Sequence, residues 1–533
     1  MGVYITLNIL PNKIGKKEWE NVYGESLKLI QGYSFMDSSV DVETYGIQWQ
    51  FVHRTEEREM EHAFGKKSRG WHVFGDYKTM LAAESFGLFR DIEIYRNGKN
   101  DHENCDDILA ELINNKVYYN QEHQQIPVNS IDVFNNKTQG FPHHIYLLGI
   151  ACLIESRFPK YAAIEGDVSI GQMKKAIDWA NSILENPIYL TERADNLKVL
   201  DRISSIVQDE FVVLKSFMGL TMHGEDFRLG EFIREQFNTD TICAYFTNQF
   251  REYDVETLGF HSILTDFFHL GFSIEMACEI CVLNSKGCQY DAEIFAEAVL
   301  SMQWPKEKGD LSNETHLDLE PYRTTPDTVD SQFGEIILKM AGVQESVRSN
   351  ISYEEVKDVL QAKLGKLVDI TELLKNNEKN YDEAEDSEID KLISQLEENM
   401  NKLTPESTAY TISDLDNLIL WEKGDTLHPT IEKELERLKE FVNETIGNNS
   451  ELYAEFHSYD DHTKVKKLIQ LNRYFYLRKE TWDYYIDHIH QTDLIDTLYG
   501  ILVIKADERN ANKLCKAVIN NVSLLKEYVL SRG

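Results

Sequence analysis

The chain has 533 residues, which is too long for one hydrophobic core and predicts two to four domains. Its 42% hydrophobic and 11% aromatic content is that of a packed globular protein and argues against disorder over most of the length. The 55 basic and 90 acidic residues give a formal net charge of −35, which argues against non-specific binding to nucleic acid or to an anionic membrane. Such an acidic surface is explained most simply by solubility, and it also suits a protein partner that is itself basic.

The cysteines indicate the compartment. The chain has seven, an odd number at irregular spacing, which is typical of a reducing environment. The first residues contain no basic leader and no small-residue cleavage site, and Gly2 lacks the downstream Ser or Thr of a myristoylation signal. The sequence therefore predicts a cytoplasmic protein with no membrane segment.

Strand and helix patterns alternate up to about residue 190. Period-two and short apolar patterns predict strands at 3–10, 45–52, 71–74, 91–95, 117–119 and 131–134. Patterns with a period of three to four predict helices at 16–30, 78–88 and 106–113. Interleaved strands and helices are expected to form a mixed α/β domain over residues 1–190.

The stretch from Phe141 to Leu184 is the clearest α/β segment of the chain. Pro142 suits a first helical turn, and the run 145–154 is apolar all round, which predicts a buried helix. That helix is too short to span a bilayer, which needs roughly 20 apolar residues. Pro159 prevents it from continuing.

A turn that could bind an anion follows. The run 161–164 predicts a strand, and it leads through Gly166 and Asp167 to a helix whose start has the capping-box spacing of Ser169 and Gln172. A helix N-terminus attracts anions, so Gly166 and Ser169 are the candidate anion-binding residues. A capped turn without a ligand is the simpler interpretation, because the glycine spacing of a nucleotide-binding loop is absent.

Strand patterns nearly disappear after about residue 195, where helices with short connections are expected. The sequence predicts a helical domain at 191–303, a linker or long loop at 304–332, and a C-terminal helical domain at 333–533. The acidic run 376–390 is expected to be a solvated connection within that last domain. The predicted fold class is α+β, with an N-terminal mixed α/β domain followed by a large, predominantly helical region.

Two groups of residues are candidates for catalysis. His261, Asp266 and His269 lie at helical spacing, and a carboxylate beside an imidazole can orient a base or hold a metal. Their apolar neighbours favour a buried His–Asp pair without a catalytic role. His72 and Asp76 lie near a predicted turn, where binding residues are common, but they also fit ordinary caps.

The weak metal candidates are Cys278, Cys281 and Cys288. A Cys-x2-Cys pair needs a second pair, or matching histidines, to indicate zinc, and this stretch also fits a core helix. No metal is therefore expected. No cofactor is expected either, since the chain contains no Walker loop, dinucleotide-binding glycine pattern or nucleophile elbow.

These observations favour a cytosolic, non-catalytic protein-interaction or regulatory protein that binds another protein. An immunity, inhibitor or defence-system role suits a chain of this class. One alternative is a hydrolase or nuclease-like enzyme that uses His, Asp and Glu from separate segments, with His269, Asp266 or His72 facing a pocket. A second alternative is an oligomeric scaffold subunit in which residues 482–503 form a helical dimer face.

Overall fold

The structure is a computed structural model that describes residues 2–61, 67–96, 106–114, 130–224, 226–305, 347, 351–375, 411–412, 414–504 and 509–530. Of the residues that the structure describes, 57% are helical and 14% are in strands, and a strand-containing N-terminal region precedes a predominantly helical one. The predicted α+β class is therefore confirmed.

The chain divides into two compact units, each made of separate segments. The first unit comprises Met1–Val22, Ile92–Asn135 and His144–Thr404, and the second comprises Tyr23–Asp91, Asn136–His143 and Pro405–Gly533. The domain boundaries inferred from the sequence at 190, 303 and 332 stay predictions. The acidic run 376–390 and residues 306–332 of the expected linker lie outside the described residues.

The first unit contains a three-stranded sheet in the order β7-β1-β8. Strand β1 (Tyr4–Ile9) runs antiparallel to β8 (Ala162–Gly166), and β7 (Ile131–Lys137) lies on its other side. The predicted strand at 3–10 is thus confirmed. Helix α1 (Lys16–Gly32) confirms the helix at 16–30, and its buried Trp19 packs against Phe158 at 6.3 Å between ring centroids.

Residues 141–184 fold as helix, strand and helix, as their sequence predicts. Helix α3 (His143–Arg157) is almost entirely buried, and α4 (Ile170–Asn181) begins with the expected capping box. The two helices meet at Tyr146 and Trp179, whose rings lie edge-on at 4.9 Å. Gly149 permits this approach, because an added Cβ would lie 2.9 Å from the Trp179 ring.

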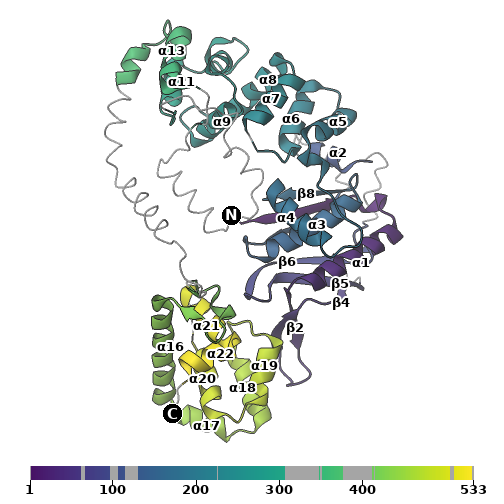
Figure 1. The fold of residues 1–533 in the computed structure, drawn as a ribbon, viewed down its shortest axis with the longest axis vertical. Helices are drawn as coiled ribbons and strands as arrows, with labels where there is room; N and C mark the ends of the chain where they lie inside the picture. The colour runs from purple at the N-terminus through teal and green to yellow at the C-terminus, as the bar shows by residue number, and fades with distance from the viewer. Residues whose placement is uncertain are drawn as a thin grey trace. The chain divides into compact units, whose positions relative to one another are not determined.

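The rest of the first unit is an array of helices, which Figure 1 shows in blue to green. These elements are α2 (Ile108–Ile113), α5 (Asn196–Ile206), α6 (Glu210–Leu220), α7 (Phe227–Gln236), α8 (Thr239–Phe250), α9 (Leu258–His269), α10 (Ile274–Cys278), the π-helical turn η6 (Glu279–Leu283), α11 (Ala292–Leu300) and α13 (Tyr353–Leu364). Their core is rich in buried phenylalanines, including Phe246 and Phe267, whose rings lie edge-on at 4.8 Å.

The second unit contains a five-stranded antiparallel sheet in the order β3-β2-β5-β4, with β6 also pairing with β5. Its strands are β2 (Phe35–Asp41), β3 (Trp49–Arg54), β4 (Arg58–Glu61), β5 (Lys67–Asp76) and β6 (Leu81–Phe89). The predicted strand at 45–52 is shifted toward the C-terminus, and the one at 71–74 is the middle of β5.

Two predictions in this region are wrong. The segment 78–88 is mostly strand β6 rather than a helix, because a turn at 77–80 folds it back onto β5. Asp76 stabilises that turn by accepting hydrogen bonds from the backbone N–H and the hydroxyl of Thr79. The segment 91–95 is a 3-10 turn over Ile92–Ile94 rather than a strand, and both of these isoleucines are buried.

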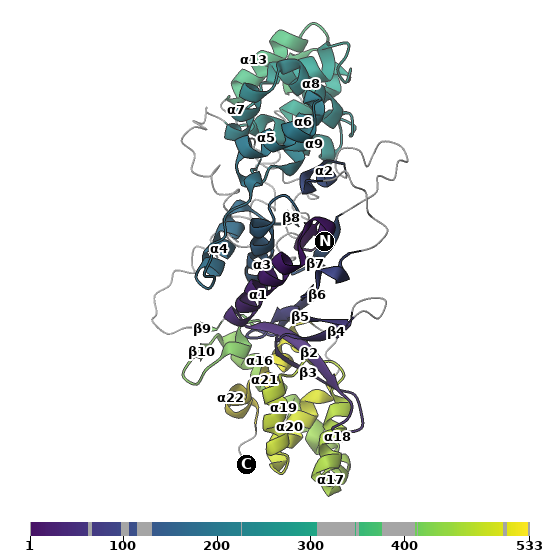
Figure 2. The ribbon, with the colours of Figure 1, turned by 90° about the vertical axis from the view of Figure 1, so that its right-hand side faces the viewer.

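The C-terminal helices share one core with this sheet, since Trp49 and Val52 belong to the same buried cluster as Leu477 and Trp482. These elements are α16 (Pro429–Asn448), α17 (Ser450–Ser458), α18 (Asp461–Leu471), α19 (Lys479–Asp487), α20 (Thr492–Leu502), α21 (Arg509–Asn520) and α22 (Val522–Leu524), with short strands β9 (Thr411–Ile412) and β10 (Thr426–Leu427). In both ribbon views α20 lies beside α18 and α19 (Figure 2). No helix in the described part of the chain is both long and apolar enough to cross a bilayer.

Candidate functional site

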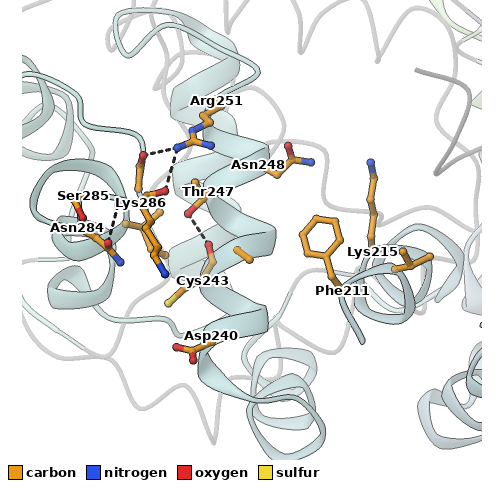
Figure 3. Close-up of a pocket in the computed structure, with 14 residues that line it drawn as sticks. Phe211, Lys215, Asp240, Cys243, Thr247, Asn248, Arg251, Asn284, Ser285 and Lys286 are labelled. Carbon is orange, nitrogen blue, oxygen red and sulfur yellow. Dashed lines mark hydrogen bonds between the residues drawn. The ribbon is translucent and has the colours of Figure 1, made fainter. Parts of the chain in front are cut away.

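A cavity of about 820 Å³ opens among the helices of the first unit (Figure 3). We call it the α6–α8 cavity. Helix α6 contributes Phe211, Val212 and Lys215; α8 and the residue after it contribute Asp240, Cys243, Ala244, Thr247, Asn248 and Arg251; η6 and the loop that follows contribute Ile280, Asn284, Ser285, Lys286 and Gly287. Its volume lies within the range of roughly 300–1,000 Å³ that is usual for ligand sites.

The starts of α6 and α8 are tied together, which fixes two walls of the cavity. Asp209 caps α6, and Asn238 caps α8 by accepting the backbone N–H of Thr241 at 2.8 Å. The carboxylate of Glu210 accepts hydrogen bonds from the Asn238 backbone at 3.2 Å and from the Thr241 hydroxyl at 2.9 Å. Phe211 and Lys215 consequently face the side of α8 that carries Asn248 (Figure 3).

Arg251 and a glycine position the loop that forms the third wall. The Arg251 guanidinium donates hydrogen bonds to the carbonyl oxygens of Lys286 at 3.1 Å and Gly287 at 2.5 Å (Figure 3). An added Cβ at Gly287 would lie 2.1 Å from the carbonyl oxygen of Ile280, so only glycine fits this close approach. The backbone N–H of Cys288 then donates to that same carbonyl at 2.8 Å.

The cavity has an excess of positive charge in a strongly acidic chain. Lys215, Arg251 and Lys286 line it, against the single carboxylate of Asp240. Within the described residues, no carboxylate forms an ion pair with the ammonium group of Lys215 or Lys286. Cations that are not neutralised by neighbours raise the local potential and attract anions. The hydroxyl and amide groups of Thr247 and Asn248 add neutral hydrogen-bonding groups.

Three thiols lie in the lining of the cavity or close to it in the chain. Burial raises the pKa of Cys243, which lines the cavity, and raises the pKa of the fully buried Cys281 well above the usual value. The pKa of Cys288 is instead lowered, chiefly because the Cys281 thiol is hydrogen-bonded to it, with contributions from Tyr290 and Arg251. Cys288 is thus the thiol that ionises more readily.

The candidate residues of α9 lie on one helix, away from the lining of this cavity. His261 and Asp266 are in its body and His269 is its last residue. His269 is 7% exposed, and burial lowers the pKa of the half-buried His261. Phe267 and Phe268, next to Asp266, are core residues. None of the three candidates lines the α6–α8 cavity, and a catalytic role for them stays a prediction.

His72 and Asp76 have different hydrogen-bonding partners in the structure. Nδ1 of His72 lies 2.7 Å from the carboxylate of Asp37, which is fully buried and also forms an ion pair with Arg58 at 2.9 Å. Asp76 is 1% exposed and serves the turn with Thr79. The carboxylate partner of His72 therefore comes from β2, 35 residues earlier in the chain. The sequence contains no local signal for this pairing.

Gly166 and Ser169 adopt the capped turn that their sequence predicts. Gly166 has a φ of 109°, and the side chains of Ser169 and Gln172 each accept a backbone N–H of the other residue at 3.3 Å. Asp167 accepts the backbone N–H of Tyr4 at 2.8 Å. The backbone N–H groups of Ser169 and Gln172, at the start of α4, are thus hydrogen-bonded within the protein. Anion binding at this turn stays a prediction.

Cys278, Cys281 and Cys288, the weak candidates for metal ligands, are free thiols. Cys278 and Cys281 are fully buried, and burial raises the pKa of Cys278 to about 12. In the ranges that the structure describes, no group of three or more His, Cys, Asp or Glu side chains is arranged to hold a metal ion.

Comparison with known proteins assigns no relationship to this chain. No protein-family model matches it, and neither a curated protein nor a solved structure shows significant similarity to it.

Proposed function

We propose that this protein is a non-catalytic, regulatory binding protein of the cytoplasm, and that the α6–α8 cavity receives an anionic segment of a protein partner. The observation that carries this proposal is the charge of the cavity. Three cationic side chains and one carboxylate line it, in a chain with a net charge of −35. An acidic or phosphorylated side chain can pair with an ammonium or guanidinium group there.

The composition of the cavity supports binding rather than catalysis. The described residues that line it include one carboxylate, Asp240, and no histidine. General acid–base chemistry at neutral pH usually needs a histidine or a second, perturbed carboxyl group. The thiol in the lining, Cys243, has a raised pKa, which opposes a role as a nucleophile.

The exposure of the lining supports a protein partner over a small molecule. Sites for small ligands are mostly apolar and bury most of the ligand surface. Here Asn248, Arg251, Ser285 and Lys286 are exposed, and Phe211 is half-buried beside them. A peptide segment can place one anionic side chain among such groups while the rest of the segment lies on the surface. Outside the cavity the surface of the protein is acidic, and it can attract basic regions of the same partner.

Fluorescence anisotropy with labelled hexaglutamate and with a labelled hexapeptide that contains phosphoserine tests this proposal. We expect the wild-type protein to bind at least one of the two probes. The Lys215→Glu/Lys286→Glu variant is expected to weaken that binding at least about tenfold, which corresponds to roughly 1.4 kcal/mol. Labelled hexalysine reports attraction to the acidic surface in general.

A charge-matched control is Lys175→Glu/Lys366→Glu, since both lysines are exposed and lie outside the cavity lining. This variant is expected to retain the affinity of the wild type for the anionic probe. Equal losses in both double variants would mean that net charge, rather than the cavity, controls the binding. Absence of binding of either anionic probe to the wild-type protein would overturn the proposal.

A further inference from the structure

Two thiols meet at the base of the loop that forms the third wall of the α6–α8 cavity. The backbone N–H of Cys288 donates to the carbonyl oxygen of Ile280, and the N–H of Tyr290 donates to that of Cys281, both at 2.8 Å. These two bonds hold the segment that carries Cys288 against η6. They therefore place Cys288 beside Cys281, the residue that directly follows Ile280 in η6.

The environment gives the two sulfurs different roles. Cys288 is half-buried, whereas Cys281 is fully buried, so an oxidant reaches Cys288 first. In its thiol form Cys288 donates a hydrogen bond to the carbonyl oxygen of Thr247 at 3.6 Å. Its pKa is lowered by the hydrogen bond from Cys281 and, to a smaller extent, by Tyr290 and Arg251. A partly exposed thiol beside a cation and a second thiol is the arrangement that reactive cysteines show.

We propose that Cys281 and Cys288 are a redox-modification site, at which a peroxide converts the two thiols into one disulfide. The Cys288 thiolate attacks one peroxide oxygen and becomes a sulfenic acid, while the O–O bond breaks and the other oxygen leaves as alcohol or water. The sulfur of Cys281 then attacks the sulfenic sulfur, the S–O bond breaks, and water leaves with the proton of the Cys281 thiol. Two thiols lose two electrons in all, and one peroxide gains them.

The disulfide would close a ring around part of the cavity wall. The residues between the two cysteines include Asn284, Ser285, Lys286 and Gly287, all of which line the cavity. Oxidation also removes the thiol proton that Cys288 donates to Thr247. The wall that carries Lys286 is therefore covalently fixed in the oxidised protein and held only by hydrogen bonds in the reduced one. This chemistry does not depend on what the cavity binds.

Peptide mapping of the full-length protein tests the proposal. The reduced protein is treated with hydrogen peroxide, its remaining thiols are alkylated with N-ethylmaleimide, and the digest is analysed by mass spectrometry. We expect a peptide pair joined through Cys281 and Cys288, lighter by two hydrogen atoms and separated again by dithiothreitol. Cys281→Ser is expected to leave a sulfenic acid on Cys288 that dimedone traps, and Cys288→Ser to abolish both products.

Cys243→Ser and Cys278→Ser are the matched controls and are expected to form the disulfide as the wild type does. Circular dichroism verifies that each variant is folded. If a variant at the buried Cys281 does not fold, the peptide map of the peroxide-treated wild-type protein still shows whether the disulfide forms. A different pairing, or full alkylation of both cysteines after peroxide treatment, would overturn the proposal. Failure of the anionic probes to bind either redox form would contradict the proposed function alone.

Discussion

Arg251 donates a hydrogen bond to the carbonyl oxygen of Gly287 at 2.5 Å, across 36 residues of sequence. With its second bond, to the carbonyl oxygen of Lys286, this side chain joins the end of α8 to the loop of the α6–α8 cavity. Hydrogen bonds from a charged donor contribute about 1.5–3 kcal/mol each. Arg251→Ala is therefore expected to increase the rate of amide hydrogen exchange in residues 284–288, measured by mass spectrometry.

The same substitution is expected to raise the pKa of Cys288, because Arg251 is one of the groups that lower it. The pH dependence of alkylation at Cys288 by iodoacetamide measures this change. Arg473→Ala, at an exposed arginine in the second unit, is the control and is expected to change neither quantity. Unaltered exchange in residues 284–288 of the Arg251→Ala protein would show that the loop holds its position without this side chain.

Gly230 allows α7 to approach the end of α9 closely. A Cβ added there would lie 1.7 Å from the carbonyl oxygen of Leu270, which is backbone and cannot rotate away. Gly230→Ala is expected to lower the free energy of unfolding by about 1–3 kcal/mol, the usual range for overpacking. Urea denaturation followed by circular dichroism measures the change.

Gly447 in α16 provides the opposite case, since an added Cβ there meets no atom within 4 Å. Gly447→Ala is expected to stabilise the protein by roughly 0.5–1 kcal/mol, because alanine loses less backbone entropy in a helix. Equal effects of the two substitutions would contradict the steric argument.

Glu155 and Arg193 form a buried ion pair in the first unit. Their charged atoms are 3.4 Å apart, and both side chains are at least nine-tenths buried. The Thr191 hydroxyl donates to Glu155 at 2.9 Å, and Arg193 also donates to the carbonyl oxygen of Ile164. Burial raises the pKa of Glu155 although Arg193 opposes this effect. The pair is therefore held against a substantial desolvation cost.

Removing one partner of this pair is expected to be worse than removing both. Arg193→Met leaves a buried carboxylate without its cation and is expected to cost about 3–5 kcal/mol of unfolding free energy. Glu155→Gln/Arg193→Met is expected to cost clearly less, since neither charge remains. Urea denaturation of the two single variants and the double variant, treated as a double-mutant cycle, measures the coupling. If the double variant lost as much unfolding free energy as Glu155→Gln and Arg193→Met together, this account would be contradicted.

Local sequence patterns predicted much of the fold where neighbours in sequence are also neighbours in space. The segment 141–184 is the clearest case. Its apolar run at 145–154, the helix end at Pro159 and the Ser169–Gln172 capping box each depend on residues that are close in sequence. The segment 78–88 shows the opposite. Its apolar residues fit a helix as well as a strand, and only pairing with β5 decides between them.

The candidate site was harder to predict than the fold. Lys215, Arg251 and Lys286 come from α6, from the end of α8 and from the loop after η6, and none belongs to a recognisable motif. Only the packing of these segments brings their charges together. The sequence identifies Cys281 and Cys288 only as weak candidates for metal ligands. The backbone hydrogen bond from Cys288 to Ile280, which places the two cysteines side by side, depends on the η6 turn. Non-local contacts of this kind leave no periodic trace in a sequence.

His144 makes the stability of the first unit depend on pH. Its imidazole is fully buried near the start of α3, and burial lowers its pKa from the usual 6.5 to about 4, against a smaller opposing effect of a hydrogen bond with Gln172. Between these two values the unfolded chain binds a proton at His144 and the folded chain does not. Protons therefore favour unfolding, and stability is lost as the pH falls from 6.5 toward 4.

The expected loss at this residue is roughly 2 kcal/mol between about pH 7 and about pH 5. His144→Gln keeps a polar side chain that does not titrate, so this part of the pH dependence should disappear. The difference between the unfolding free energies at the two pH values, from urea denaturation, measures it for each protein. His490→Gln, at an exposed histidine, is the control and should retain the wild-type difference. If His144→Gln retains it too, His144 is protonated in the folded protein as readily as in the unfolded one.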